Sequence, residues 1–259
     1  MTQKVQGAQS FARAMQVLRR IADAPSPPRL TDLLRDEAFT RPTLHRVLAS
    51  LEAEQMIRRS DDKRYHLDVG LISLAHQALA QQDVRTVAHE SLMALRDETG
   101  ETVHLAVRSG DRMVYIDKIE SGQTVRMASS VGTSVAMHSS SVGRAWLSAL
   151  SKDARETVIE GLTLAAFTPQ TITDLGVLKE ATAQGARDGY CVEGEENEAG
   201  IVCCGAAIVD GRERPIAAVS VSIPTFRVAS DKRKYTAPLV RCCERVSALI
   251  GWPGRVVTR

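Results

Sequence analysis

Residues 30–51 constrain the fold of this chain more than any other stretch, because they hold two short amphipathic segments separated by only a few residues. In the second segment the apolar residues fall at positions i, i+3, i+4 and i+7, namely Leu44, Val47, Leu48 and Leu51. This spacing gathers them on one face of a helix and leaves the opposite face polar. Two such segments around a short turn predict a helix-turn-helix.

The second helix of this pair is expected to begin near Arg41. Thr40 suits the N-cap position, since its hydroxyl can accept a hydrogen bond from the first-turn amides, and Pro42 suits the first turn because it lacks an amide hydrogen. In a helix-turn-helix, the N-terminal part of the second helix enters the major groove of DNA. The residues expected nearest to bases and phosphates are Arg41, Thr43, His45 and Arg46.

An ordinary two-helix hairpin within a helical bundle would show the same pattern, so the flanking residues must distinguish the two. Residues 9–24 predict a helix that ends before Pro25, and residues 56–59 and 64–68 predict two short strands around a turn. Three helices followed by a β-hairpin indicate a winged helix-turn-helix, whose wing contacts the DNA backbone or the minor groove. The basic residues of the predicted wing are Arg58, Arg59, Lys63 and Arg64.

Length and composition are typical of a globular protein with two domains. The chain has 259 residues, of which 44% are hydrophobic and 25% charged, and this length exceeds that of a usual single domain. Its apolar runs are shorter than the roughly 20 residues that span a bilayer, and the N-terminus lacks the apolar core of a signal peptide. We therefore expect a cytoplasmic protein without a membrane partner.

The formal net charge of +2 is divided unevenly along the chain. Residues 1–81 carry 12 Lys and Arg against 9 Asp and Glu, a balance of +3, which leaves −1 for the remaining residues. This excess is weak support for nucleic-acid binding by itself. It gains weight because several of the basic residues lie where the predicted motif would contact phosphate.

The rest of the chain predicts a linker helix at residues 68–83, another helix from residue 84 to residue 99, and then an α+β domain. Strands are expected at residues 102–108, 113–120, 123–129, 201–209 and 215–223. Helices are expected at residues 141–151, 152–161, 174–189 and 231–250. The predicted domains are a DNA-binding domain at residues 1–67, the linker at residues 68–83, and a domain at residues 84–259 with an antiparallel sheet flanked by helices.

The chain resembles the IclR family of bacterial transcriptional regulators over nearly its whole length. The match is carried by TRPTLHRVLASLEAEQMI and KRYHLD in the first domain, and by GETVHLAV, VYIDKIES, VGTSVAMHSSSVGRAW, TPQTIT, GYCVEGEENEAGIVCCGAAIV and AVSVSIP in the second. The resemblance implies a winged helix-turn-helix, a linker helix and a GAF-like effector-binding domain, assembled as a homodimer or homotetramer. The chain departs from the family pattern at Ala38, where glycine is usual, and at Pro42, where serine is frequent.

The resemblance also implies a pocket for a small organic acid in the second domain. Its matching positions are Ser141, Val142, Glu193, Cys203, Ser220 and Ser222, and Glu193 replaces a commoner aspartate. Residues 141–142 open a predicted helix, whose first amides can hold an anion. Ser220 and Ser222 lie two apart on a predicted strand, so both can donate to one carboxylate. Val135 and Met137 are expected to form an apolar wall.

Other interpretations of these residues remain open. The serines can be ordinary strand residues and Cys203 small core filling, or Cys203 can be the nucleophile of a hydrolase, although no histidine motif lies beside it. The five cysteines include two adjacent pairs, which favours reduced thiols over disulfides and permits a redox switch. His104 and His138 lack metal-ligand spacing, so we expect structural or pocket-edge roles for them and no metal or cofactor.

We favour a transcriptional regulator, repressor or activator, rather than an enzyme. It is expected to bind a palindromic double-stranded DNA operator and to respond to a small or aromatic carboxylate in the second domain.

Overall fold

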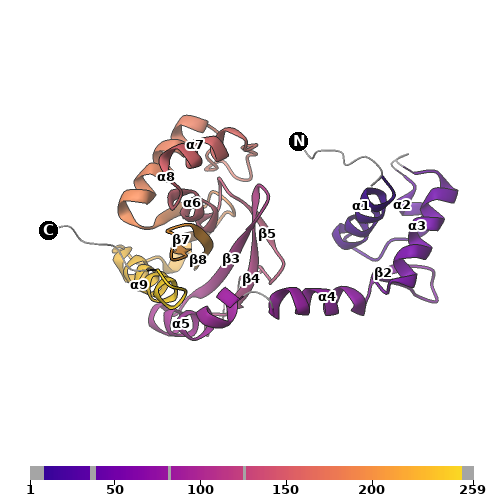
Figure 1. The fold of residues 1–259 in the computed structure, drawn as a ribbon, viewed down its shortest axis with the longest axis horizontal. Helices are drawn as coiled ribbons and strands as arrows, with labels where there is room; N and C mark the ends of the chain where they lie inside the picture. Colours follow the sequence, from indigo (N-terminus) through magenta and orange to yellow (C-terminus); the bar gives the residue numbers. More distant parts are fainter. Residues whose placement is uncertain (1–8, 36–38, 81–82, 125–126, 253–259) are drawn as a thin grey trace. The chain divides into compact units, whose positions relative to one another are not determined.

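The computed structural model describes residues 9–35, 39–80, 83–124 and 127–252 (Figure 1). The chain forms two compact units, residues 1–81 and residues 82–259. Within the described ranges, every helix is too short or too polar to cross a membrane.

The first unit contains three helices followed by a small antiparallel sheet. Its elements are α1 (Gln9–Asp23), α2 (Leu30–Leu33), α3 (Arg41–Ala53), β1 (Ile57–Arg59), β2 (Tyr65–Leu67) and α4 (Val69–Ala80). The predicted apolar stripe of α3 is confirmed, since Leu44, Leu48 and Leu51 are buried and share a core with Val17 and Ile21 of α1. The winged helix-turn-helix is therefore present.

The wing formed by β1 and β2 is tied to the segment that precedes α2. The backbone amide of Tyr65 donates to the carbonyl of Pro28 at 2.9 Å, and Arg29 forms a β-bridge with Arg64. At the tip, Lys63 has a left-handed backbone with φ of 64°. Ser60 donates its amide to the carbonyl of Arg64 at 2.9 Å, which closes the predicted turn. These bonds hold the wing against the segment that precedes α2, and Ile57 and Tyr65 of the wing share a core with Leu44 of α3.

The second unit is an antiparallel sheet with helices on both faces, so the predicted α+β class is confirmed. The strands are β3 (Thr102–Ser109), β4 (Arg112–Ile119), β5 (Ser134–Ala136), β6 (Cys191–Gly194), β7 (Ile201–Val209) and β8 (Pro215–Pro224), in the order β5-β4-β3-β8-β7-β6. The helices are α5 (Asp83–Thr99), α6 (Ser141–Ser148), α7 (Lys152–Glu160), α8 (Leu175–Asp188) and α9 (Arg233–Leu249), with a 3-10 turn η1 (Thr225–Arg227). Figure 1 shows α5 and α9 together along one face and α6, α7 and α8 on the other.

The strand predicted at residues 123–129 is wrong for the residues that the structure describes, 123–124 and 127–129. The Nζ of Lys118 donates to the carbonyls of Met127 and Ser129 at 2.9 and 2.6 Å, so these acceptors bond an ammonium group rather than a neighbouring strand. The third strand on this side is β5 instead, and β6 was not predicted. Ala38, where the family pattern has glycine, lies outside the described residues.

Candidate DNA-binding surface and ligand cavity

The first turn of α3 begins as predicted but is capped differently. Thr40 occupies the N-cap position with extended backbone and Pro42 lies in the first turn. The prediction that the Thr40 hydroxyl caps a backbone amide is wrong, because this hydroxyl lies 2.9 Å from the hydroxyl of Thr43. Thr43 is half-buried, whereas Arg41 and Arg46 are exposed. His45 on the same helix is exposed as well.

The wing adds further cations in the same unit. Arg58, Arg59 and Lys63 are exposed, and the guanidinium of Arg59 lies over the ring of Tyr65 at 5.9 Å. Arg64 differs from them because its guanidinium donates to the carbonyl of Pro27 at 2.8 Å and pairs with Asp62 at 2.9 Å. Arg64 therefore anchors the wing. We call the exposed cations of α3 and the wing the basic surface: Arg41, Arg46, Arg58, Arg59 and Lys63.

A cavity of about 270 Å³ lies on the sheet of the second unit, and we call it the sheet cavity. Glu193 on β6 stands opposite Cys203 on β7, which in turn stands opposite Ser222 on β8. Because directly opposed residues of antiparallel strands share a face, these three side chains point the same way. The described lining residues are His104, Tyr115, Met127, Ala128, Ser129, Thr133, Val135, Glu193, Asn197, Glu198, Ile201, Cys203 and Ser222.

Half of the predicted ligand residues line this cavity. They are Val135, Glu193, Cys203 and Ser222, while those that do not line it are Met137, Ser141, Val142 and Ser220. A β-carbon added to Gly205 would lie 2.4 Å from the carbonyl oxygen of Ser141, so the first turn of α6 packs directly on the sheet. Ser141 and Val142 are buried there, and the expected anion site at the start of α6 does not open into the cavity.

Hydrogen bonds join the side chains across the floor of the sheet cavity. The Cys203 thiol donates to the Ser222 hydroxyl at 3.3 Å, and that hydroxyl lies 3.3 Å from Nδ1 of His104. Nε2 of His104 lies 2.7 Å from the Ser129 hydroxyl, and its ring stacks on Tyr115 with centroids 4.4 Å apart. His104 therefore lines the site. Sequence alternation along β3 places it on one face of the sheet, but only the pairing of β3 with β8 brings it to Ser222.

Burial is the main cause of the pKa shifts of His104, Glu193 and Tyr115 in the cavity. Burial, assisted by the nearby Lys118 ammonium, lowers the pKa of His104 to about 3, so this ring is neutral at pH 7. Burial raises the pKa of Glu193 to about 7, although the neighbouring Cys203 side chain and the Glu196 amide act to lower it. Burial also raises the pKa of Tyr115. The cavity thus holds a carboxyl group whose pKa is raised into the neutral range.

The cysteines lack the electrostatics of reactive thiols. Burial raises the pKa of Cys203 well above its ordinary value, and His104 reaches this thiol only through Ser222. Burial raises the pKa of Cys204 to about 11 and of Cys242 to about 12, and also raises the pKa of Cys191 and Cys243. The thiolate is the nucleophile and the readily oxidised form, so this geometry does not favour a cysteine hydrolase or a redox switch. Within the described ranges, acidic, histidine and cysteine side chains form no cluster suited to a metal ion.

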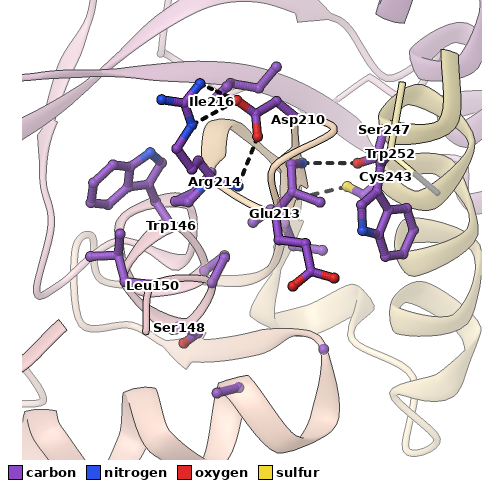
Figure 2. A pocket seen from close by; sticks show the side chains of 18 of the residues that line it. Trp146, Ser148, Leu150, Asp210, Glu213, Arg214, Ile216, Cys243, Ser247 and Trp252 are labelled. Atoms are coloured by element: carbon purple, nitrogen blue, oxygen red, sulfur yellow. Dashed lines mark hydrogen bonds and ion pairs between the residues drawn. The ribbon is translucent and has the colours of Figure 1, made fainter. Parts of the chain in front are cut away.

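A larger cavity of about 990 Å³ lies between α6, the β7–β8 turn and α9 (Figure 2). Trp146 and Leu150 lie on one side of it and Trp252 on the other. Two of the turn charges at its rim are paired, since Arg214 donates to Asp210 at 3.0 and 2.7 Å. None of the predicted ligand residues lines this larger cavity, whereas four of them line the sheet cavity, which is therefore the candidate effector site.

Comparisons with known proteins match both units to the same protein family. The family model for the C-terminal part of the bacterial transcriptional regulator IclR matches residues 76–248, and the IclR helix-turn-helix domain matches residues 10–61. The chain is 29% identical over 247 residues to the HTH-type transcriptional regulator XynR of Escherichia coli, covering 95% of this chain and 98% of XynR.

Solved structures of similar proteins share the fold of this chain. The crystal structure of the Thermotoga maritima IclR is 30% identical, with a TM-score of 0.75, over 94% of this chain and 99% of that one. An IclR homolog from Microbacterium hydrocarbonoxydans, crystallised as a complex with 4-hydroxybenzoate, shares the fold at 22% identity, with a TM-score of 0.78 over 92% and 98% of the two chains.

Proposed function

Because this chain belongs to the IclR family of bacterial transcriptional regulators, we propose that it binds operator DNA through α3 and the wing and responds to a small organic acid in the sheet cavity. Members of this family are transcriptional regulators rather than enzymes. The observation that carries the proposal is one chain joining an exposed basic surface on a winged helix to a polar cavity in a second unit.

The proposed DNA contacts divide by their chemistry. On α3, Arg41, Thr43, His45 and Arg46 are suited to reach base edges and nearby phosphates in the major groove. On the wing, Arg58, Arg59 and Lys63 would supply salt-dependent affinity through phosphate contacts, while Arg64 holds the wing in place. We propose a homodimer or homotetramer that presents two such heads to a palindromic operator, which would place the protein in the cytoplasm with the DNA.

The proposed effector is a small or single-ring carboxylic acid. Cavities of about 150 Å³ accommodate benzene, so 270 Å³ leaves room for one ring with polar substituents. The Ser222 hydroxyl, next to the Cys203 thiol, provides a donor, and the stacked rings of His104 and Tyr115 provide a flat wall. The homolog complexed with 4-hydroxybenzoate supports this ligand class for a protein of the same fold.

A thermal-shift screen of small and aromatic carboxylates tests the effector site. A ligand that binds only the folded protein, at 100 times its dissociation constant, adds about 2.7 kcal/mol of stability, which corresponds to a rise in melting temperature of roughly 5–10 °C. We expect Ser222→Ala to reduce this rise by at least half, because it removes a cavity donor. Ser230→Ala, at an exposed serine outside the cavity, should keep the full rise. Equal rises in both variants would contradict the assignment of the sheet cavity.

A further inference from the structure

We propose that the sheet cavity binds its acid ligand together with one proton, which Glu193 carries in the complex. This inference rests on the proposed function and concerns how the same site recognises a carboxylate. It predicts that ligand affinity depends on pH in a range where the ligand itself stays fully ionised.

Glu193 is built into the cavity rather than placed at its rim. Its side chain is 2% exposed, and it lines the cavity from the edge strand β6, opposite Cys203. Oε2 of Glu193 accepts the backbone amide of Glu196 at 3.0 Å, which fixes the carboxyl group in place. A carboxylate that approaches Cys203 and Ser222 must therefore come close to a second carboxyl group.

The cations near Glu193 form hydrogen bonds within the protein, although Nε of Arg144 is buried without a partner. Arg144 of α6 donates to the Glu196 carboxylate and to the carbonyl of Val192, both at 2.9 Å. Lys118 of β4 donates to two backbone carbonyls of residues 127–129 and pairs with Glu120 at 3.1 Å. Neither of these two side chains lines the cavity. Their charges are thus committed to the protein rather than offered to a ligand.

The remaining groups that face the cavity do not offer a positive charge either. Its described lining contains no lysine or arginine, and it includes a second carboxylate, Glu198. His104 of β3 is neutral at pH 7, and the raised pKa of Tyr115 on β4 and Cys203 on β7 keeps both protonated. An anionic ligand therefore meets hydroxyl and thiol groups, together with one carboxyl group, that of Glu193, which can be protonated or ionised.

Two carboxylates in contact within a buried site cannot both ionise at a small free-energy cost, because like charges repel strongly away from water. One proton from solvent removes this repulsion. A protonated Glu193 donates its hydroxyl to the ligand carboxylate, and such O–H···O⁻ bonds are short and strong. Burial has already raised the pKa of Glu193 to about 7, so this carboxyl group takes up a proton near neutral pH more readily than an exposed glutamate does.

The size of the pH effect follows from the fraction of molecules in which Glu193 is protonated, which we call the competent fraction. Below pH 7 Glu193 is mostly protonated and binding is nearly independent of pH. Above pH 7 the competent fraction falls, so the apparent dissociation constant rises by about tenfold between pH 6 and pH 8 and approaches tenfold per further pH unit. Over the same range, His104 stays neutral because its pKa of about 3 lies far below.

Isothermal titration calorimetry of the full chain with benzoate tests the proposal, at pH 6, 7 and 8 in two buffers of different ionisation enthalpy. The wild type should lose about tenfold in affinity from pH 6 to pH 8 and take up nearly one proton at pH 8. Glu193→Gln keeps an amide donor but cannot titrate, so its affinity should be constant and its proton uptake zero. Glu180→Gln, at an exposed glutamate of α8 outside the cavity, should keep the wild-type dependence.

Three results would overturn the proposal: benzoate binding without proton uptake, tighter binding of benzylamine than of benzoate at pH 6, and absence of benzoate binding at pH 6. In each case, the proposed function stands if another acid raises the melting temperature and Ser222→Ala reduces that rise. If no acid raises the melting temperature, the effector proposal is refuted as well. Circular dichroism establishes whether Glu193→Gln folds. If this variant does not fold, the proton uptake of the wild type on binding benzoate tests the proposal by itself.

Discussion

Replacement of Arg46 by alanine is expected to weaken operator binding by about 5- to 150-fold for each recognition helix. Arg46 is exposed on α3, on the face opposite the buried Leu44, Leu48 and Leu51. An arginine that contacts a base or a close phosphate contributes about 1–3 kcal/mol, and the loss scales with the number of heads bound. The measurement is fluorescence anisotropy at fixed salt, with a duplex selected by the wild type from a random pool.

The matched control for this prediction is Arg245→Ala. Arg245 is an exposed arginine on α9 of the second unit, so its removal changes the net charge equally without touching the basic surface. This variant should bind within about twofold of the wild type. Equal affinities of the Arg46 and Arg245 variants would show that α3 does not read the DNA.

Gly205→Ala is expected to destabilise the second unit by about 3 kcal/mol and to lower its melting temperature by roughly 5–10 °C. The added β-carbon would lie 2.4 Å from the carbonyl oxygen of Ser141, and backbone atoms cannot rotate away as a side chain can. Helix α6 would have to move off the sheet, close to Ser220 on the neighbouring strand. Thermal unfolding followed by circular dichroism measures the change.

Gly122→Ala provides the matched control, because a β-carbon at Gly122 would meet no described atom within 4 Å. Its melting temperature should stay within about 2 °C of the wild type, as is usual for surface substitutions. Should Gly205→Ala melt with the wild type as well, the close packing of α6 on β7 would be refuted.

The first unit could be predicted closely from the sequence because its signals are local. Leu44, Leu48 and Leu51 repeat within one helix, and the turn that Lys63 closes lies between adjacent strands. The capping of α3 is harder to predict, since Thr43 competes with the backbone for the hydroxyl of Thr40. Such competition between neighbouring hydroxyl groups is not visible in a helix pattern.

The sheet cavity could be predicted only in part, because it is assembled by long-range strand pairing. The match to family positions predicts Glu193, Cys203 and Ser222, but His104 joins them only through the register of β3 against β8. Alternation predicts which residues share a face of one strand and leaves the register between distant strands undetermined. Ser220 shares the face of Ser222, but it stands opposite Gly205, where α6 covers the sheet.

The most direct test of the account measures operator affinity with and without an acid that the thermal-shift screen identifies, in the wild type and in Ser222→Ala. We expect the acid to change the affinity of the wild type by about 5- to 150-fold, the range of ordinary allosteric coupling, with the direction reporting repression or activation. Ser222→Ala should bind the operator with wild-type affinity and lose most of the response at the same acid concentration. An acid that binds the wild type but leaves its operator affinity unchanged would contradict the account.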